Sequence, residues 1–187
     1  MKKIYLAQTF FILFIFFLTP QGILEAANIS FTGEPKATVN TPYSIGIVLS
    51  GGEKTLGTDS VILYDPSMLK ATSVTQGTLY PTYNPSANGR INLEKGKIIL
   101  SGSTGFNNPV GATGVFSKIT FTPIKKGKTL IRFDYAKGDT TKTGIIDFSG
   151  KDLLSAMPKP LAITIENESP IEIVWRYMTK AFSFLKK

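Results

Sequence analysis

The sequence predicts an all-β fold, a two-sheet antiparallel sandwich of nine or ten short strands. In the middle of the chain, apolar residues alternate with polar ones, as they do from Tyr43 to Ser50. Turn-forming Gly, Pro, Asn and Asp residues separate these runs, and no long helical pattern lies among them. The composition, 42% hydrophobic and 18% charged with 17 Gly and 11 Pro, is typical of a β-rich globular domain.

Ten runs carry this strand pattern, because each is enriched in β-branched or alternating apolar residues and is bounded by turn residues. Alternation gives each strand one buried face, which is what two packed sheets require. The predicted strands are Ile29–Thr32, Tyr43–Ser50, Thr58–Tyr64, Ala71–Gln76, Arg90–Glu94, Lys97–Ser101, Val115–Pro123, Thr129–Tyr135, Gly144–Phe148 and Leu161–Glu166.

The N-terminus has the pattern of a secretory signal, which we assign to residues 1–27. Lys2 and Lys3 precede an apolar run, and small residues follow at Ala26 and Ala27, where a peptidase would cut. An uncleaved membrane anchor is the alternative, because the apolar stretch is just long enough to span a bilayer. Both predict an exported domain over residues 28–166, secreted or held at the cell surface.

The C-terminal residues 167–187 predict a short linker and a basic amphipathic helix. Ser169 is expected as the N-cap, with Pro170 in the first helical position and Glu172 completing a capping box. Apolar residues then recur at three- and four-residue steps opposite a basic face. This pattern predicts contact with an anionic membrane surface, or packing on a protein as the alternative. The membrane-contacting residues would be Trp175, Lys180, Phe182, Lys186 and Lys187.

The 187 residues include no His and no Cys. This excludes Ser-His-Asp and Cys-His catalysis, zinc sites built on His or Cys, and disulfides. A glycosidase would need two carboxylates about 5–9.5 Å apart in a cleft, and no pair of acids stands out in the sequence. The chain carries a net charge of +8, but export argues against nucleic acid as its partner. We therefore expect no enzyme.

Several motifs, in order along the chain, resemble those of cohesin domains, the modules of cellulosomal scaffold proteins that bind dockerins. The central one runs from Leu56 to Leu69 and contains Tyr64-Asp65-Pro66. The resemblance spans most of residues 29–166. The other matching segments are Val39–Tyr43, Gly77–Pro81, Gly114–Phe121 and Lys126–Thr129.

The resemblance implies a nine-stranded jelly roll in which one sheet face receives a dockerin, or another envelope protein with the same role. It also implies no cofactor on this chain, because the calcium ions reside in the dockerin loops. Type I cohesins contact the dockerin through an Asn-x-Asp motif, and the matching residues here are Gly57, Thr58 and Asp59. Asp59 is retained, whereas Gly57 replaces the Asn.

Two alternatives remain open from the residues themselves. Aromatic rings at Tyr80, Tyr83 and Phe106 lie in loop-like contexts and would bind a polysaccharide if they are exposed, so the alternative function is a carbohydrate-binding module. Loop acids, chiefly Asp134, Asp139, Asp147 and Asp152, would supply oxygen ligands for calcium if the loops meet. Their spacing does not match an EF-hand, and single loop Asp residues are usually turn residues.

Overall fold

The computed structural model describes residues 26–52, 54–83, 90–93 and 95–171, together with 173, 174 and 178. Over these residues the chain forms fourteen strands. They are β1 (Asn28–Thr32), β2 (Lys36–Thr38), β3 (Tyr43–Ser50), β4 (Lys54–Thr55), β5 (Gly57–Leu63), β6 (Leu69–Gln76), β7 (Thr82–Tyr83), β8 (Arg90–Asn92), β9 (Lys97–Ser103), β10 (Val110–Gly111), β11 (Gly114–Pro123), β12 (Gly127–Phe133), β13 (Gly144–Ile146) and β14 (Leu161–Glu166).

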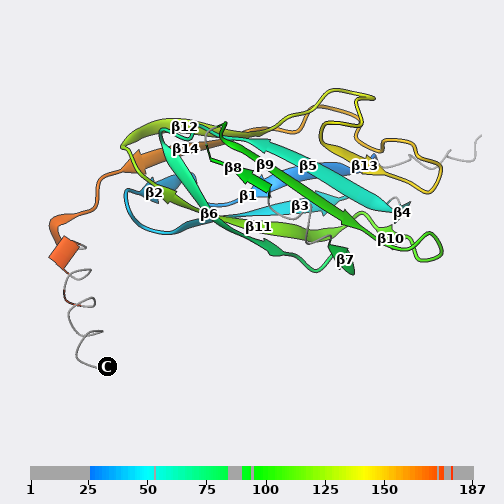
Figure 1. Ribbon diagram of the computed structural model, residues 1–187, viewed down its shortest axis with the longest axis horizontal. Coiled ribbons are helices and arrows are strands. Elements are labelled where there is room, and N and C mark those ends of the chain that lie inside the picture. Colours follow the sequence, from blue (N-terminus) through cyan, green and yellow to red (C-terminus); the bar gives the residue numbers. More distant parts are fainter. Residues whose placement is uncertain are drawn as a thin grey trace, which may run out of the picture.

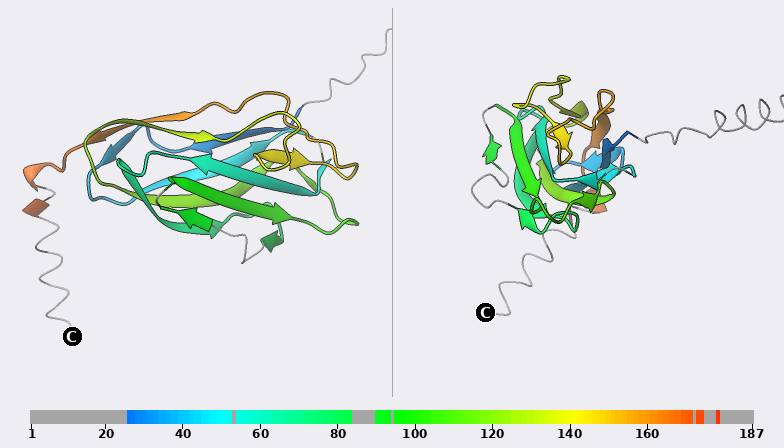
Figure 2. Two further views of the ribbon diagram at one scale, coloured as in Figure 1. Left: turned by 45° about the horizontal axis from the view of Figure 1, so that its top comes forward. Right: turned by 90° about the vertical axis from the view of Figure 1, so that its right-hand side faces the viewer.

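The strands form two facing sheets, seen as two curved layers in the end-on view of Figure 2. The first sheet has the order β1-β3-β11-β6. The second has the order β2-β14-β12-β5-β9-β7, with β13 paired to β5 and β8 paired to β9. β4 and β10 form a separate two-stranded ribbon at one end. The described chain begins at that end and leaves the sandwich at the other (Figure 1).

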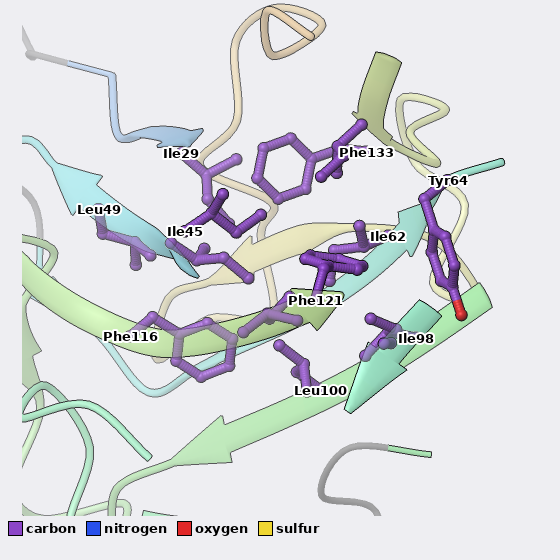
Figure 3. Packing of buried hydrophobic residues seen from close by; sticks show 14 of the residues in the cluster. Ile29, Ile45, Leu49, Ile62, Tyr64, Ile98, Leu100, Phe116, Phe121 and Phe133 are labelled. Atoms are coloured by element: carbon purple, nitrogen blue, oxygen red, sulfur yellow. The ribbon is translucent and has the colours of Figure 1, made fainter. Parts of the chain in front are cut away.

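The core lies between the sheets and is almost entirely aliphatic and aromatic. Ile45 and Phe121 of the first sheet face Ile62 and Ile98 of the second, and all four are at most 1% exposed (Figure 3). In β3 and β9, buried residues alternate with less buried ones, so the period-two pattern places one side of each strand in the core. In β5, Ser60, Val61 and Ile62 are buried in succession. Burial of the apolar core side chains supplies the main free energy of folding.

Close packing of the sheets also depends on one glycine. A Cβ at Gly102 of β9 would lie 2.6 Å from the Phe116 ring and 2.8 Å from the Tyr80 ring. These distances are shorter than van der Waals contact, so any side chain here would push the rings apart. Gly102 therefore allows both aromatic residues to pack directly against the backbone of β9.

All ten predicted strands are present, and the two-sheet sandwich is confirmed. Four strands were not predicted, because they have only two or three residues each, too few to show alternation: β2, β4, β7 and β10. The strand pairing is antiparallel except at one edge. There, β14 pairs with β2 in parallel, because the chain crosses from the first sheet to the edge of the second directly after β1.

The two ends of the chain lie largely outside the described residues. Residues 1–25, which hold most of the predicted signal, are not described. Helical backbone is described at 170, 171, 173, 174 and 178, and the Ile173 N–H donates to the Ser169 carbonyl at 3.1 Å. The predicted membrane-contacting residues Trp175, Lys180, Phe182, Lys186 and Lys187 are outside that description. The amphipathic helix therefore stays a prediction. Within the described part, no helix is long and apolar enough to cross a membrane.

Replacing Phe121 by Ala tests the core. Phe121 is fully buried and packs edge-on against Tyr64 with ring centroids 5.2 Å apart. Because the change removes buried surface and leaves a cavity, we expect the free energy of unfolding in urea to fall by about 3–5 kcal/mol. The control is Leu130→Ala, since Leu130 is 52% exposed, and its effect should be within about 0.5 kcal/mol. Equal effects would contradict this description of the core.

Candidate functional site

Strand β5 is paired along both edges and carries the residues that the sequence analysis singled out. β9 pairs with its whole length on one side. On the other side, β13 pairs with Gly57–Asp59, and β12 pairs with Ile62 and Leu63. One partner edge is therefore made of two strands, β12 and β13, which are separated in sequence by residues 134–143. We call this segment the excursion.

The excursion leaves the sheet and returns without breaking the hydrogen bonding of β5. The Asp134 N–H donates to the Val61 carbonyl at 2.7 Å, and the Val61 N–H donates to Thr143 Oγ1 at 3.0 Å. The Thr143 N–H donates to the Asp134 carbonyl at 2.9 Å, which closes the base of the loop. Lys142 Nζ also contacts Asp134 Oδ2 at 2.7 Å, and this bond raises the pKa of Lys142. The excursion is thus anchored at its base beside the outer face of β5.

Asp59 lies on the outer face of the second sheet between two small residues. In the ladder it is opposite Gly144 on β13 and Ser101 on β9, and directly paired residues project their side chains on the same face. Gly144 has no side chain and that of Ser101 is short, so neither ladder neighbour covers the exposed Asp59 carboxylate. Such a carboxylate can accept hydrogen bonds from a partner.

The core side of β5 fixes the position of Gly57 and Asp59. Thr58 points inward and is 2% exposed, and its hydroxyl lies 2.6 Å from the Tyr80 hydroxyl. Thr55 Oγ1 lies 3.1 Å from the same Tyr80 hydroxyl, accepts the Gly57 N–H at 3.1 Å, and lies 2.9 Å from the Ile146 carbonyl. This buried polar network ties the start of β5 to the end of β13.

A pocket opens beside Asp59, between the excursion and the turn that follows β13. Asp59, Asp139 and Asp152 supply three carboxylates to its lining, and Lys142 supplies the one ammonium group among the described lining residues. A Cβ added at Gly144 would lie 3.7 Å from the Asp152 carboxylate, so this glycine leaves space between Asp59 and Asp152. The remaining lining residues are Gly138, Thr140, Gly144, Ile146 and Gly150.

A groove adjoins the pocket at the end of the sheet, flanked by two exposed aromatic rings. Phe106 is 84% exposed and Phe148 is 73% exposed. Gly57 and Ser103, a directly opposed pair in the ladder, lie in the groove lining. Ile146 and Gly150 line both the groove and the pocket, so the two hollows are continuous.

The structure separates the predicted site residues into exposed and buried ones. Asp59 is exposed and Gly57 is half-buried, whereas the Thr58 side chain faces the core and cannot touch a partner. The expectation that Tyr80 is an exposed ring is wrong: it is 3% exposed because its ring packs edge-on against Phe116 and its hydroxyl bonds to Thr58. Burial raises the pKa of Tyr80.

The other two predicted sugar-binding rings differ from each other. Tyr83 is half-buried, and its hydroxyl lies 3.0 Å from Ser117 Oγ. Burial raises the pKa of Tyr83, and its ring packs against Phe116. Only Phe106 of the three predicted rings is widely exposed. The described residues therefore do not form a flat strip of these three aromatic rings.

The loop acids considered for calcium each have a local partner. Asp139 Oδ1 accepts the backbone N–H and the hydroxyl of Thr141 at 2.9 and 2.7 Å, and Asp147 accepts the same pair of donors from Ser149. Asp152 Oδ1 accepts the N–H groups of Ile145 and Leu154. Among the described residues, no three acids are grouped to hold a metal ion. These acids organise the turns around the pocket.

Sequence reasoning missed two residues of this region, Phe148 and Gly144. Phe148 was predicted as the last residue of the strand Gly144–Phe148. The segment Asp147-Phe148-Ser149-Gly150 is instead a turn, and the Asp-x-Ser pattern could have indicated it. Gly144 carries no sequence signal, because its importance comes from the residue opposite it on β5.

Comparison with known proteins agrees with this architecture. The profile of the family described as "Cohesin domain" matches residues 30–150, more than half of the chain. The chain belongs to the cohesin family. Cohesin domains are non-catalytic modules that bind dockerins and need no cofactor, as the sequence resemblance implied. No curated protein matches the sequence closely enough to count as a relative.

Solved cohesin structures share the fold at low sequence identity. A chain of a type I cohesin–dockerin complex from Clostridium thermocellum is 18% identical, with a TM-score of 0.62 over 76% of this chain and 94% of that one. A type II cohesin domain from the cellulosome of Acetivibrio cellulolyticus is 19% identical, with a TM-score of 0.55 over 74% and 95% of the two chains. A cohesin module of a family 33 glycoside hydrolase from Clostridium perfringens is 14% identical, with a TM-score of 0.57 over 77% and 99%.

Replacing Tyr80 by Phe tests the role of the buried network. The change removes the hydroxyl that lies 2.6 Å from Thr58 Oγ1 and leaves that buried group without this partner. We expect the free energy of unfolding, measured in urea, to fall by about 1–2 kcal/mol. Retention of the variant and of the wild type on insoluble polysaccharide should be equal. Unchanged stability together with lost sugar retention would contradict the structural role of Tyr80.

The turn acids predict a dependence of stability on pH. Hydrogen bonds from Ser67, Thr141 and Ser149 hold the pKa values of Asp65, Asp139 and Asp147 below their ordinary range. The unfolded chain therefore binds protons at a higher pH than the folded one. Their stabilising contribution is complete above the unfolded pKa of about 3.9 and is lost as the pH falls through the lower folded values.

Urea unfolding at a series of pH values from 7 to 3 measures this contribution. A variant with all three residues changed to Asn should be less stable than the wild type at pH 7, and its stability should fall less steeply below about pH 4. Parallel curves for the two proteins would show that these hydrogen bonds do not stabilise the folded state.

Proposed function

We propose that this cohesin domain binds a dockerin through the outer face of the second sheet, centred on Asp59 of β5. The observation that carries the proposal is the position of Asp59. It is exposed in the middle of a sheet that is paired on both sides, and its two ladder neighbours are Gly144 and Ser101. Neither of these two small residues covers the carboxylate, so a docking partner can reach it from that face.

The rigidity of this face supports the proposal. β5 is hydrogen-bonded to β9 on one edge and to β12 and β13 on the other. On the core side of the sheet, the Thr58 hydroxyl is hydrogen-bonded to the Tyr80 hydroxyl. A surface held in this way loses little conformational entropy when it binds, which favours protein recognition. Matches to structures of cohesin–dockerin complexes are consistent with this role.

We also propose that the domain is exported and works outside the cell or at its surface. The N-terminal residues 1–27 have the basic, apolar and small-residue order of a secretory signal. Cohesins are typically extracellular parts of cellulosomes, which fits this location. Contact of the C-terminal residues with a membrane surface is a separate prediction from their amphipathic sequence pattern.

Capture from an extract of the source organism tests the dockerin proposal. The full-length chain is immobilised and incubated with extract in calcium or in a chelator, and captured proteins are identified by mass spectrometry. We expect a dockerin-bearing protein in calcium only, because dockerin folding depends on calcium. In Asp59→Lys, reversed charge at the centre of the face should weaken binding of that dockerin about tenfold or more.

The matched control is Glu34→Lys, which makes the same charge reversal at an exposed residue between β1 and β2. Its affinity should equal that of the wild type. Absence of any dockerin-bearing protein from the calcium eluate would contradict the proposal, as would equal affinities of Asp59→Lys and the wild type. Retention on insoluble polysaccharide with no protein captured would instead support a carbohydrate-binding module, for which the exposed Phe106 ring is the structural argument.

A further inference from the structure

Two hydrogen-bonded turns hold the rings that flank the groove. The Asn108 N–H donates to the Gly105 carbonyl at 2.9 Å, so Phe106 lies within a closed turn. The Asp147 N–H donates to the Lys151 carbonyl at 3.0 Å. Asp147 Oδ1 also accepts the backbone N–H groups of Ser149 and Lys151. Phe106 and Phe148 are therefore presented to solvent by defined backbone rather than by an open loop.

The floor of the groove is held in place as well. The Leu56 N–H donates to the Ile146 carbonyl, and the Thr104 N–H donates to the Leu56 carbonyl, both at 2.8 Å. These bonds join the ends of β13 and β9 to the segment just before β5. A large apolar side chain entering the groove would contact both aromatic rings and Ile146, and this contact would remove apolar surface from water.

The pocket beside the groove has the opposite charge to the chain as a whole. The full sequence carries +8, yet the described pocket lining holds three carboxylates and one ammonium group. That ammonium group, on Lys142, is already paired with a fourth carboxylate, on Asp134. The electrostatic field in the pocket therefore favours a cation from the partner.

The two hollows are close enough together for one helix to reach both. The groove is lined at Gly57 and the pocket at Asp59, and two residues along a strand span about 7 Å. Side chains three or four residues apart on a helix are separated by about 5–6 Å along its surface. One helix lying across the end of the sheet can therefore place one side chain in each hollow.

We propose that the groove and the pocket form one docking surface for an amphipathic dockerin helix, which inserts a large apolar side chain between Phe106 and Phe148 and, one turn along, a lysine or arginine beside Asp59, Asp139 and Asp152. This inference rests on the proposed function and adds the chemistry of the partner residues that select this cohesin. Carboxylates on the same surface disfavour an anionic membrane as the occupant, because they would repel its headgroups.

Four variants test this surface against the dockerin captured by the wild-type chain. Phe106→Ala and Phe148→Ala remove one ring each. Asp139→Asn keeps the acceptor for Thr141 but removes a pocket charge. Gly144→Val fills the pocket between Asp59 and Asp152, and the open contacts around Gly144 accommodate the added Cβ. Isothermal titration in calcium at two salt concentrations gives each affinity, and urea unfolding checks that each variant is folded.

The controls are matched in chemistry and line neither the groove nor the pocket. Met157→Ala removes an apolar side chain that is 70% exposed. Asp65→Asn makes the same change as Asp139→Asn in the same kind of turn, because Asp65 also accepts the backbone N–H and the hydroxyl of the residue two positions on. Asp65 follows the opposite end of β5.

We expect the affinity to fall about tenfold in each Phe variant and in Gly144→Val, as at interface hot spots, with no change in either control. Asp139→Asn should weaken binding at low salt and reduce its salt dependence. If Asp59→Lys abolishes dockerin binding while these four variants bind like the wild type, the inference fails and the proposed function stands. If the wild type captures no dockerin, both fail. Loss of polysaccharide retention in the Phe variants would also overturn the inference, because the groove would then be a sugar site.

Discussion

Strand β5 must satisfy its backbone hydrogen bonds on both edges, and the rest of the second sheet is arranged around that requirement. A buried peptide group without a partner costs free energy, so the gap between β12 and β13 cannot be left open. The Thr143 hydroxyl fills it by accepting the Val61 N–H, and the Asp134 N–H supplies the donor for the Val61 carbonyl. The ten-residue excursion can therefore leave the sheet while β5 remains a central strand.

The domain therefore has two parts: a buried sandwich framework, and a surface that the loops form around the end of β5. The two sheets, their aliphatic core and the network of Thr55, Thr58 and Tyr80 make a stable cohesin sandwich. The excursion, the turn after β13 and the turn after β9 then surround the end of β5 with acidic and aromatic side chains. Framework residues are buried and pair with one another, whereas the surface residues project into solvent and are available to a partner. Differences in binding partner among cohesins of one fold would arise from such loops.

The long strands could be predicted from the sequence, because alternation such as that from Tyr43 to Ser50 requires one buried face. The parallel pairing of β14 with β2 could not, since it depends on where a three-residue edge strand lies in space. Asp59 was found through its place in a family motif. Tyr80 was expected to be exposed, but its ring is buried because Gly102 has no side chain to block it. A sequence does not show which glycine packs against which aromatic residue. Phe148 was missed because a strand pattern and a turn pattern overlap there.

The central claim is that the outer face of β5 and its neighbours receives the partner. Backbone NMR of the ¹⁵N-labelled chain, titrated with the dockerin that it captures, tests this most directly. The account predicts that the largest shifts on binding occur at Asp59, at its ladder partners Ser101 and Gly144, and at Gly57 two residues earlier on β5. Shifts confined to β3, β6 and β11, in the opposite sheet, would contradict it.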